Sequence, residues 1–322
     1  MFRFAEAVTR IESATTFGEL VGDRDEERAY REWVKLVHPD AVSAAESATA
    51  TAAFARLAKL YADRAGAELR TPQAIYRIGG IVASGDLADL SAVDGKRALL
   101  KVPRSPADND LMEAEAGALE RLWRDGDPKY RPYAPRLLES FVHEDGARVR
   151  RRANVLERLA GFVPVSRIGR EIDPRDAAWM WRRLLVALGW AHRAGVVHGA
   201  IVEEHVLINP AEHGLAIVDW CYSGRHPPAI VKRLAGAYPP EVRTRREASP
   251  ATDIYMATGL MTRLVGNGLP KALKRFAGGC LYDAPRMRPQ DAWALLGEFD
   301  ELLHKLYGPR TFRPFHIDIE ED

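Results

Sequence analysis

The stretch from Val196 to Cys221, VVHGAIVEEHVLINPAEHGLAIVDWC, decides how the rest of the chain is interpreted. Two short runs rich in β-branched residues, 206–208 and 215–218, are separated by residues typical of turns. This pattern predicts a β-hairpin. A tight polar loop that starts at His198 precedes the hairpin, and an acid, Asp219, stands at its exit.

This order of loop, hairpin and acid resembles the catalytic core of protein kinases, in which His-Arg-Asp precedes a hairpin and Asp-Phe-Gly follows it. Here the two tripeptides are His198-Gly199-Ala200 and Asp219-Trp220-Cys221. The resemblance gives position 200 to the Asp that accepts the substrate proton, and position 205 to the Asn that holds a second Mg²⁺. Ala200 accepts no proton and His205 replaces the Asn, whereas Asp219 matches the other metal ligand. The resemblance therefore implies a pseudokinase.

Composition places few limits on function. The chain has 322 residues, of which 47% are hydrophobic and 28% are charged, and this length predicts two domains. A formal net charge of +1 gives no bias towards nucleic acid or membrane. Cys221 and Cys280 lack the spacing of a disulfide framework or a zinc site. No apolar run has the length of a membrane span. We therefore expect a cytoplasmic protein with neither a nucleic-acid nor a membrane partner.

The N-terminal part of the chain has the pattern of packed helices. Apolar residues recur at helical spacing from Tyr30 to Val37, and Arg31 and Lys35 lie on the opposite face. This helix is expected to end at His38-Pro39-Asp40, because a proline disfavours helix in the residue before it. A further amphipathic helix carries Phe54 and Leu57. With a short helix that begins at Phe17, after a capping box of Thr16 and Glu19, the segment thus predicts a compact set of three helices.

A helix with a basic face, a His-Pro-Asp loop and a returning helix resemble the J domain of DnaJ-type co-chaperones. The resemblance implies that His38, Pro39 and Asp40, together with Arg31 and Lys35, bind a DnaK-type chaperone and stimulate its ATP hydrolysis. A helical hairpin in which the tripeptide is only a turn, with Asp40 capping the next segment, is the alternative.

A linker and domain boundary are expected at residues 66–74, which have no apolar periodicity and contain a proline. From Tyr76 the chain predicts strands at 76–84, 86–93 and 97–102, with a turn at Asp94-Gly95. This part resembles the kinase N-lobe. Of the glycine-rich loop only Gly85 remains, and the carboxylate of Asp86 opposes the approach of phosphate.

Lys101 matches the strand lysine that binds the α and β phosphates in kinases, and it needs an acid from the next helix. In LMEAEAGALERL, Glu115 has the better register and Glu113 is the fallback. The alternative is an exposed lysine and an exposed glutamate. If a nucleotide binds, the resemblance implies Gly85, Lys101, Glu115 and Asp219 as its site, with Asp219 holding Mg²⁺.

The C-terminal half carries residues that the resemblance assigns to folding. A long amphipathic helix is expected over residues 174–194. Glu241 matches the Ala-Pro-Glu motif, Arg288 matches the arginine that pairs with it, and Asp253 starts the next core helix. His192 and His198 are expected to make structural hydrogen bonds rather than bind metal. A set of basic residues is either a solvated face or a surface for an acidic partner: Arg225, Lys232, Arg233, Arg243, Arg245 and Arg246.

The chain is thus expected to have an α+β fold: a helical J domain over 1–68, a two-lobed kinase-like domain over 75–308, and an acidic tail over 309–322. The hypothesis for its function is a co-chaperone-type adaptor that recruits a DnaK-type chaperone. Its kinase-like domain, with Ala200 and His205 at degenerate positions, would bind an unknown client, a regulator or a nucleotide.

Two alternatives stay open. In one, the protein is an active ATP-dependent transferase in which Glu203, Glu204 or His205 replaces the missing base. In the other, it is a nucleotide sensor whose ligand state controls the J domain. No cofactor is certain, and ATP with Mg²⁺ is the candidate.

Overall fold

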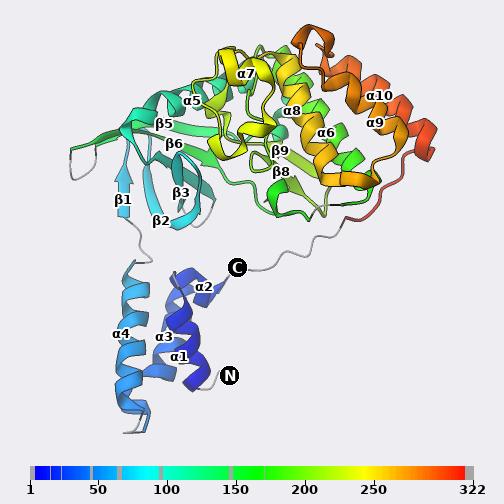
Figure 1. Cartoon of the computed structure of the whole chain (residues 1–322). Helices are drawn as coiled ribbons and strands as arrows, with labels where there is room; N and C mark the ends of the chain where they lie inside the picture. Colours follow the sequence, from blue (N-terminus) through cyan, green and yellow to red (C-terminus); the bar gives the residue numbers. More distant parts are fainter. Residues whose placement is uncertain are drawn as a thin grey trace. The chain divides into compact units, whose positions relative to one another are not determined.

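The computed structural model describes residues 4–14, 16–22, 24–43, 46–63, 67–93, 97–144, 148–169 and 171–315 (Figure 1). The fold mixes helices with antiparallel strands and begins with a helical segment, so the predicted α+β class is confirmed. The turn predicted at Asp94-Gly95 and the part of the acidic tail from residue 316 lie outside the described residues. The chain divides into two compact units, one of residues 1–85 and 89–101, the other of residues 86–88 and 102–322.

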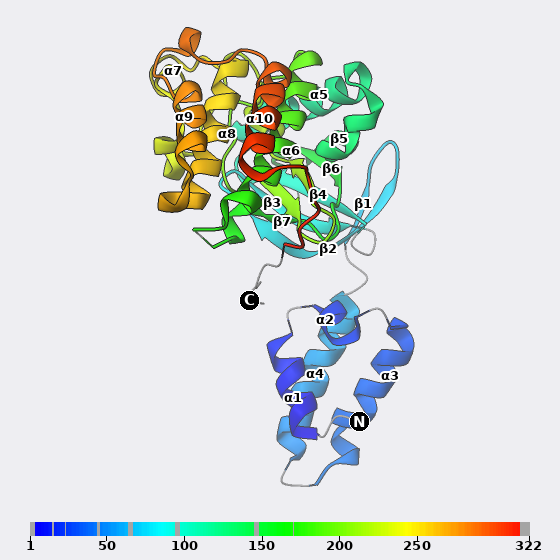
Figure 2. The ribbon, with the colours of Figure 1, turned by 90° about the vertical axis from the view of Figure 1, so that its right-hand side faces the viewer.

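The first unit starts with four α-helices and a 3₁₀ turn: α1 (Phe4–Ser13), α2 (Phe17–Val21), α3 (Glu26–Val37), η1 (Pro39–Ala41) and α4 (Ser47–Asp63). Figure 2 shows α1 and α3 with α4 between and behind them. Phe17, Trp33 and Leu57 are almost fully buried among these helices. The rings of Tyr30 and Tyr61 stack with centroids 3.7 Å apart, which ties α3 to α4.

Helix α3 has well-defined ends. The carboxylate of Asp25 accepts a hydrogen bond of 2.8 Å from the backbone amide of Arg28, which caps the N-terminus. The helix stops at Val37, immediately before His38 and Pro39, as the sequence predicts. The tripeptide His38-Pro39-Asp40 therefore forms the start of the connection to α4.

Four strands follow in the sheet order β1 (Ala67–Arg70), β2 (Ile75–Ser84), β3 (Ala88–Val93) and β4 (Ala98–Pro103). Strand β1 pairs antiparallel with β2, with Leu69 opposite Tyr76. Residues 67–70, which lie in the expected linker, thus form a strand. A strand is held by backbone hydrogen bonds to its neighbour, and these do not require an apolar pattern in the strand itself. The domain boundary at 66–74 stays a prediction.

The second unit contains most of the remaining elements. Its α-helices are α5 (Asn109–Asp125), α6 (Pro174–Arg193), α7 (Pro240–Arg245), α8 (Pro250–Val265), α9 (Lys271–Cys280) and α10 (Ala292–Tyr307). Its strands are β5 (Leu137–Glu144), β6 (Arg150–Glu157), β7 (Val163–Pro164), β8 (Val206–Asn209) and β9 (Gly214–Ile217). Its 3₁₀ segments are η2 (Pro106–Asp108), η3 (Pro128–Tyr133), η4 (Val165–Arg167), η5 (Trp220–Tyr222), η6 (Lys232–Ala237), η7 (Gly266–Gly268) and η8 (Pro285–Met287).

Helix α6 lies at the centre of the core of this unit. It packs against α8 and α10 (Figure 1), and Trp181, Leu184 and Leu188 on it are buried. The long helix predicted at 174–194 is thus confirmed. Strands β8 and β9 form the predicted hairpin, with Leu207 opposite Ala216. No helix in the described ranges is both long and apolar enough to span a bilayer.

Candidate functional site

The loop between α6 and β8 is anchored by one buried carboxylate. Asp253, on α8, has no exposed surface. Its Oδ2 accepts hydrogen bonds of 2.9 Å from the backbone amide of His198 and from Nε2 of His192, and its Oδ1 accepts one of 2.8 Å from the amide of Gly199. These three bonds hold the start of the loop against the core.

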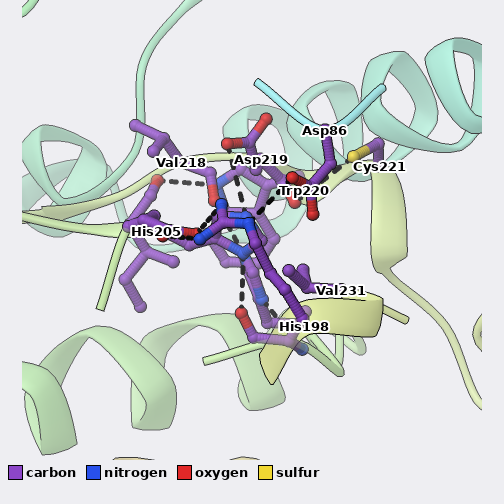
Figure 3. A network of polar contacts seen from close by, with 12 residues as sticks. Asp86, His198, His205, Val218, Asp219, Trp220, Cys221 and Val231 are labelled. Atoms are coloured by element: carbon purple, nitrogen blue, oxygen red, sulfur yellow. Dashed lines mark hydrogen bonds and ion pairs between the residues drawn. The ribbon is translucent and has the colours of Figure 1, made fainter. Parts of the chain in front are cut away.

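The ring of His198 links the loop to the end of β9 (Figure 3). Its Nε2–H donates to the carbonyl of Val218 at 2.9 Å, and its Nδ1 accepts from the amide of Ala200 at 3.2 Å. Complete burial lowers the pKa of His198 to about 4, so the ring is neutral at pH 7. The prediction that His192 and His198 make structural hydrogen bonds is confirmed.

Positions 199 and 200 leave no room for a larger polar side chain. Gly199 has a φ of +74°, and a Cβ built there would lie 3.0 Å from the carbonyl oxygen of Tyr222. Such a φ is costly for residues other than glycine. Ala200 is completely buried. The position that the kinase resemblance assigns to a base therefore presents only a methyl group, and it presents it to the core.

His205 and Asp219 lie side by side at the open end of the hairpin (Figure 3). His205 is 5% exposed, and its Nδ1–H donates to the carbonyl of Ala200 at 2.9 Å. Its Nε2 lies 3.5 Å from Oδ2 of Asp219, whose side chain is one-third exposed. Asp219 itself has left-handed backbone angles, φ 60° and ψ 48°.

This pair of side chains offers Mg²⁺ a single carboxylate and no second oxygen ligand. Magnesium prefers six oxygen ligands in octahedral geometry, and the two neighbouring side chains supply one carboxylate and one imidazole nitrogen. Across the part of the chain that the structure describes, no group of three or more His, Cys, Asp or Glu residues could hold a metal ion. His205 thus places an imidazole nitrogen, rather than an amide oxygen, beside Asp219.

Arg233 connects three segments that are far apart in the sequence. Its Nε donates to Oδ1 of Asp86 at 2.9 Å, and its two Nη groups contact both carboxylate oxygens of Glu204. The carboxylate of Glu204, one of the three residues considered as a replacement base, is therefore engaged. Sequence reasoning placed Arg233 only in a basic cluster, because no local pattern relates residues 29 and 147 positions apart.

Lys101 and Glu115 are both buried, 3% and 0% exposed, so the alternative of an exposed lysine and an exposed glutamate is wrong. Glu115 lies on α5 and accepts a hydrogen bond of 3.0 Å from Nδ2 of Asn154. The fallback residue, Glu113, is exposed and lies 3.9 Å from Arg152. Lys101 belongs to the first unit and Glu115 to the second. Gly85 is exposed in the turn between β2 and β3.

Glu241 and Arg288 form a buried ion pair. Arg288 donates from Nη1 and Nη2 to the two oxygens of Glu241, at 2.7 and 3.1 Å, and Thr252 donates to the same carboxylate at 3.0 Å. Both charged side chains are at most 4% exposed. The geometry is that of a structural pair, since neither group is accessible to a ligand.

The His-Pro-Asp loop presents its acid to water. The side chain of Asp40 is 91% exposed, and its closest described partner is Nδ1 of His38 at 3.7 Å. The backbone amide of Asp40 donates to that same Nδ1 at 3.2 Å, so the tripeptide is also a turn. Arg31 is 74% exposed and pairs with Glu27 at 3.1 Å, and Lys35 is exposed one turn further along α3.

Comparison with known proteins adds no relative: no family model matches the chain, and neither does any curated protein. The two resemblances therefore rest on the residues quoted from the sequence.

Proposed function

We propose that the chain is a co-chaperone-type adaptor, in which the N-terminal helices recruit a DnaK-type chaperone and the kinase-like remainder binds a partner protein. The observation that carries the proposal is the fully solvated carboxylate of Asp40, which directly follows a helix with exposed Arg31 and Lys35. No described backbone amide is capped by this carboxylate. Its exposure thus favours recognition by a partner over a role as a cap for the next helix.

The loop around residue 200 supports the second half of the proposal, a kinase-like domain without phosphotransfer. Ala200 is buried and Glu204 is bound by Arg233. Asp219 faces an imidazole at 3.5 Å in place of an amide. Each of these features opposes one requirement of phosphoryl transfer, namely a base within reach of the substrate and oxygen ligands for magnesium.

The test is a single-turnover measurement of ATP hydrolysis by a purified DnaK-type chaperone with and without this protein. The unchanged protein should accelerate hydrolysis, and Asp40→Asn should return the rate to the basal value, because the amide keeps the shape of the side chain but removes its charge. Glu12→Gln is the matched control. Glu12 is also an exposed acid of the helical segment, on α1, and its substitution should leave the stimulation intact.

Equal stimulation by the Asp40→Asn protein would contradict the proposal and leave the tripeptide as a turn. Raising the salt concentration gives an independent check. Exposed charges such as Arg31 and Lys35 are screened by salt, so the stimulation should weaken between low and physiological ionic strength.

A second candidate is an ATP-dependent transferase that uses His205 as its base. The observation that favours it is the contact of His205 with Asp219, since a carboxylate beside an imidazole is a common arrangement for proton transfer. The 5% exposure of His205 counts against it, because a base must reach the attacking hydroxyl.

A further inference from the structure

A cavity of about 660 Å³ lies inside the second unit, away from the ring of His205. One wall is a face of α5 formed by Ala114, Gly117, Ala118 and Arg121, which recur at intervals of three and four residues. The opposite wall combines the end of α6, from His192 to Val197, with Ser223–Arg225 and the start of α8. The volume is in the range of small-molecule sites.

The charges at this cavity are unbalanced. Arg121 and Arg225 line it, both are exposed, and neither guanidinium makes a hydrogen bond or ion pair with a described residue. No carboxylate is among the described lining residues. Asp125, one turn beyond Arg121 on α5, is already held by two hydrogen bonds from Arg124, at 2.8 and 2.9 Å. Arg121 therefore has only a longer-range attraction to Asp125. Two cations without a hydrogen bond or close ion pair at one cavity favour an anionic occupant.

The third polar group at the cavity is His192, whose side chain is nine-tenths buried. Its Nε2–H donates to Asp253, and its Nδ1 is buried without a hydrogen-bond partner among the described residues. Buried polar atoms of this kind are rare, because the water they lose is normally replaced by a partner. In the neutral ring Nδ1 is an acceptor, so a hydroxyl group would satisfy it.

We propose that this cavity binds a small phosphorylated polyol, such as a sugar phosphate. Its phosphate is bound by Arg121 and Arg225, since guanidinium groups match phosphate oxygens in geometry and charge. Its hydroxyls face the wall that contains His192. The site is distinct from the loop residues His205 and Asp219 and needs no metal ion.

The test is isothermal titration of the full chain with ribose 5-phosphate, with ribose and inorganic phosphate as the two partial probes. Ribose 5-phosphate should bind, ribose should not, and phosphate alone should bind at least roughly tenfold more weakly. Arg121→Ala and Arg225→Ala should each weaken binding of ribose 5-phosphate by roughly tenfold or more.

Gly117 offers a matched pair of variants. A Cβ placed on it would meet no atom within 4 Å, so alanine fits there. Alanine and leucine both have a higher helix propensity than glycine. Gly117→Leu should abolish binding by filling the cavity, whereas Gly117→Ala should retain it. Thermal melting of both variants shows that the fold is kept.

Three results would overturn the proposal: absence of binding by ribose 5-phosphate, equal binding of phosphate alone, or binding that survives Gly117→Leu and loss of both arginines. The last would place the ligand elsewhere on the chain. None of these results depends on chaperone stimulation. The adaptor proposal is therefore tested independently of the cavity.

Discussion

At the scale of single residues, His198 makes stability depend on pH. Its ring is buried and neutral, and its pKa in the folded chain is about 4, against 6.5 for an unperturbed histidine. Between these values the unfolded chain binds a proton that the folded chain does not. The free energy of unfolding should therefore fall as the pH drops from 6.5 to 4, and His198 should account for roughly 3 kcal/mol of this fall. Above pH 6.5, His198 should not change the free energy of unfolding with pH.

The measurement is denaturant unfolding at pH values from 4 to 8 for the unchanged protein and for His198→Gln. Glutamine can donate a hydrogen bond to the carbonyl of Val218 but does not titrate. The variant should be less stable at pH 7, because the bond from the amide of Ala200 is lost, and its stability should decline less steeply below pH 6.5. Identical slopes for the two proteins would show that His198 does not carry the effect.

The sequence predicted some neighbours in this loop and missed others. The approach of His205 to Asp219 follows from the hairpin, because residues that flank paired strands lie close together. The contacts of Arg233 with Asp86 and Glu204 could not be predicted in this way. They join residues from three separate segments, and only the folded chain brings these together.

At the scale of elements, α1 and β1 are among those that were not predicted, and the reason is the same for both. Helix α1 has ten residues, and a helix of this length is marginal alone in water. Strand β1 has four residues and carries Glu68 and Arg70. Each is stabilised by a partner distant in sequence: α1 packs on α4, and β1 pairs with β2. By contrast α3, α6 and the β8–β9 hairpin have strong internal patterns, and the sequence predicts them well.

Arg56 on α4 tests this explanation. Its Nε donates to the carbonyl of Ile11 and its Nη2 to the carbonyl of Ala14, both at 2.8 Å, so it closes the C-terminal end of α1 from 42 to 45 residues away. Those carbonyls lie where a helix lacks internal partners. Arg56→Ala should destabilise the helical segment by about 1–3 kcal/mol and speed amide exchange along α1.

Hydrogen exchange followed by mass spectrometry gives the readout, with Lys59→Ala as control. Lys59 is also a cation on α4, and no described residue forms an ion pair or hydrogen bond with it. Its substitution should leave the exchange of α1 unchanged. If Arg56→Ala also has no effect on α1, packing alone holds that helix and the proposed cap is irrelevant.

At the scale of the whole molecule, buried polar contacts join distant segments of the second unit. The ion pair of Glu241 with Arg288 is buried. The carboxylate of Asp253 accepts hydrogen bonds from the amides of His198 and Gly199, and these bonds fix the start of the loop. The sequence indicates these contacts, because Glu241, Asp253 and Arg288 stand at positions that the kinase resemblance assigns to folding. The sequence gives no indication of the cavity beside α5, because its lining comes from four separate stretches of the chain that share no pattern.

The last prediction concerns the chemistry of the loop around Ala200: the protein should transfer no γ-phosphate to serine, threonine or tyrosine. General-base assistance typically contributes about 10² to 10⁴ in rate, and Ala200 supplies none of it. Glu204 is held by Arg233, and His205 is nearly buried. The assay uses ATP labelled separately on the γ-phosphate and on the adenine, incubated with the purified protein and with a cell lysate. The expected result is no transfer of either label. Transfer of γ-phosphate that disappears in Asp219→Ala would contradict the proposal of a kinase-like domain without phosphotransfer. Transfer of the adenine label would identify a transferase that moves the nucleotide instead.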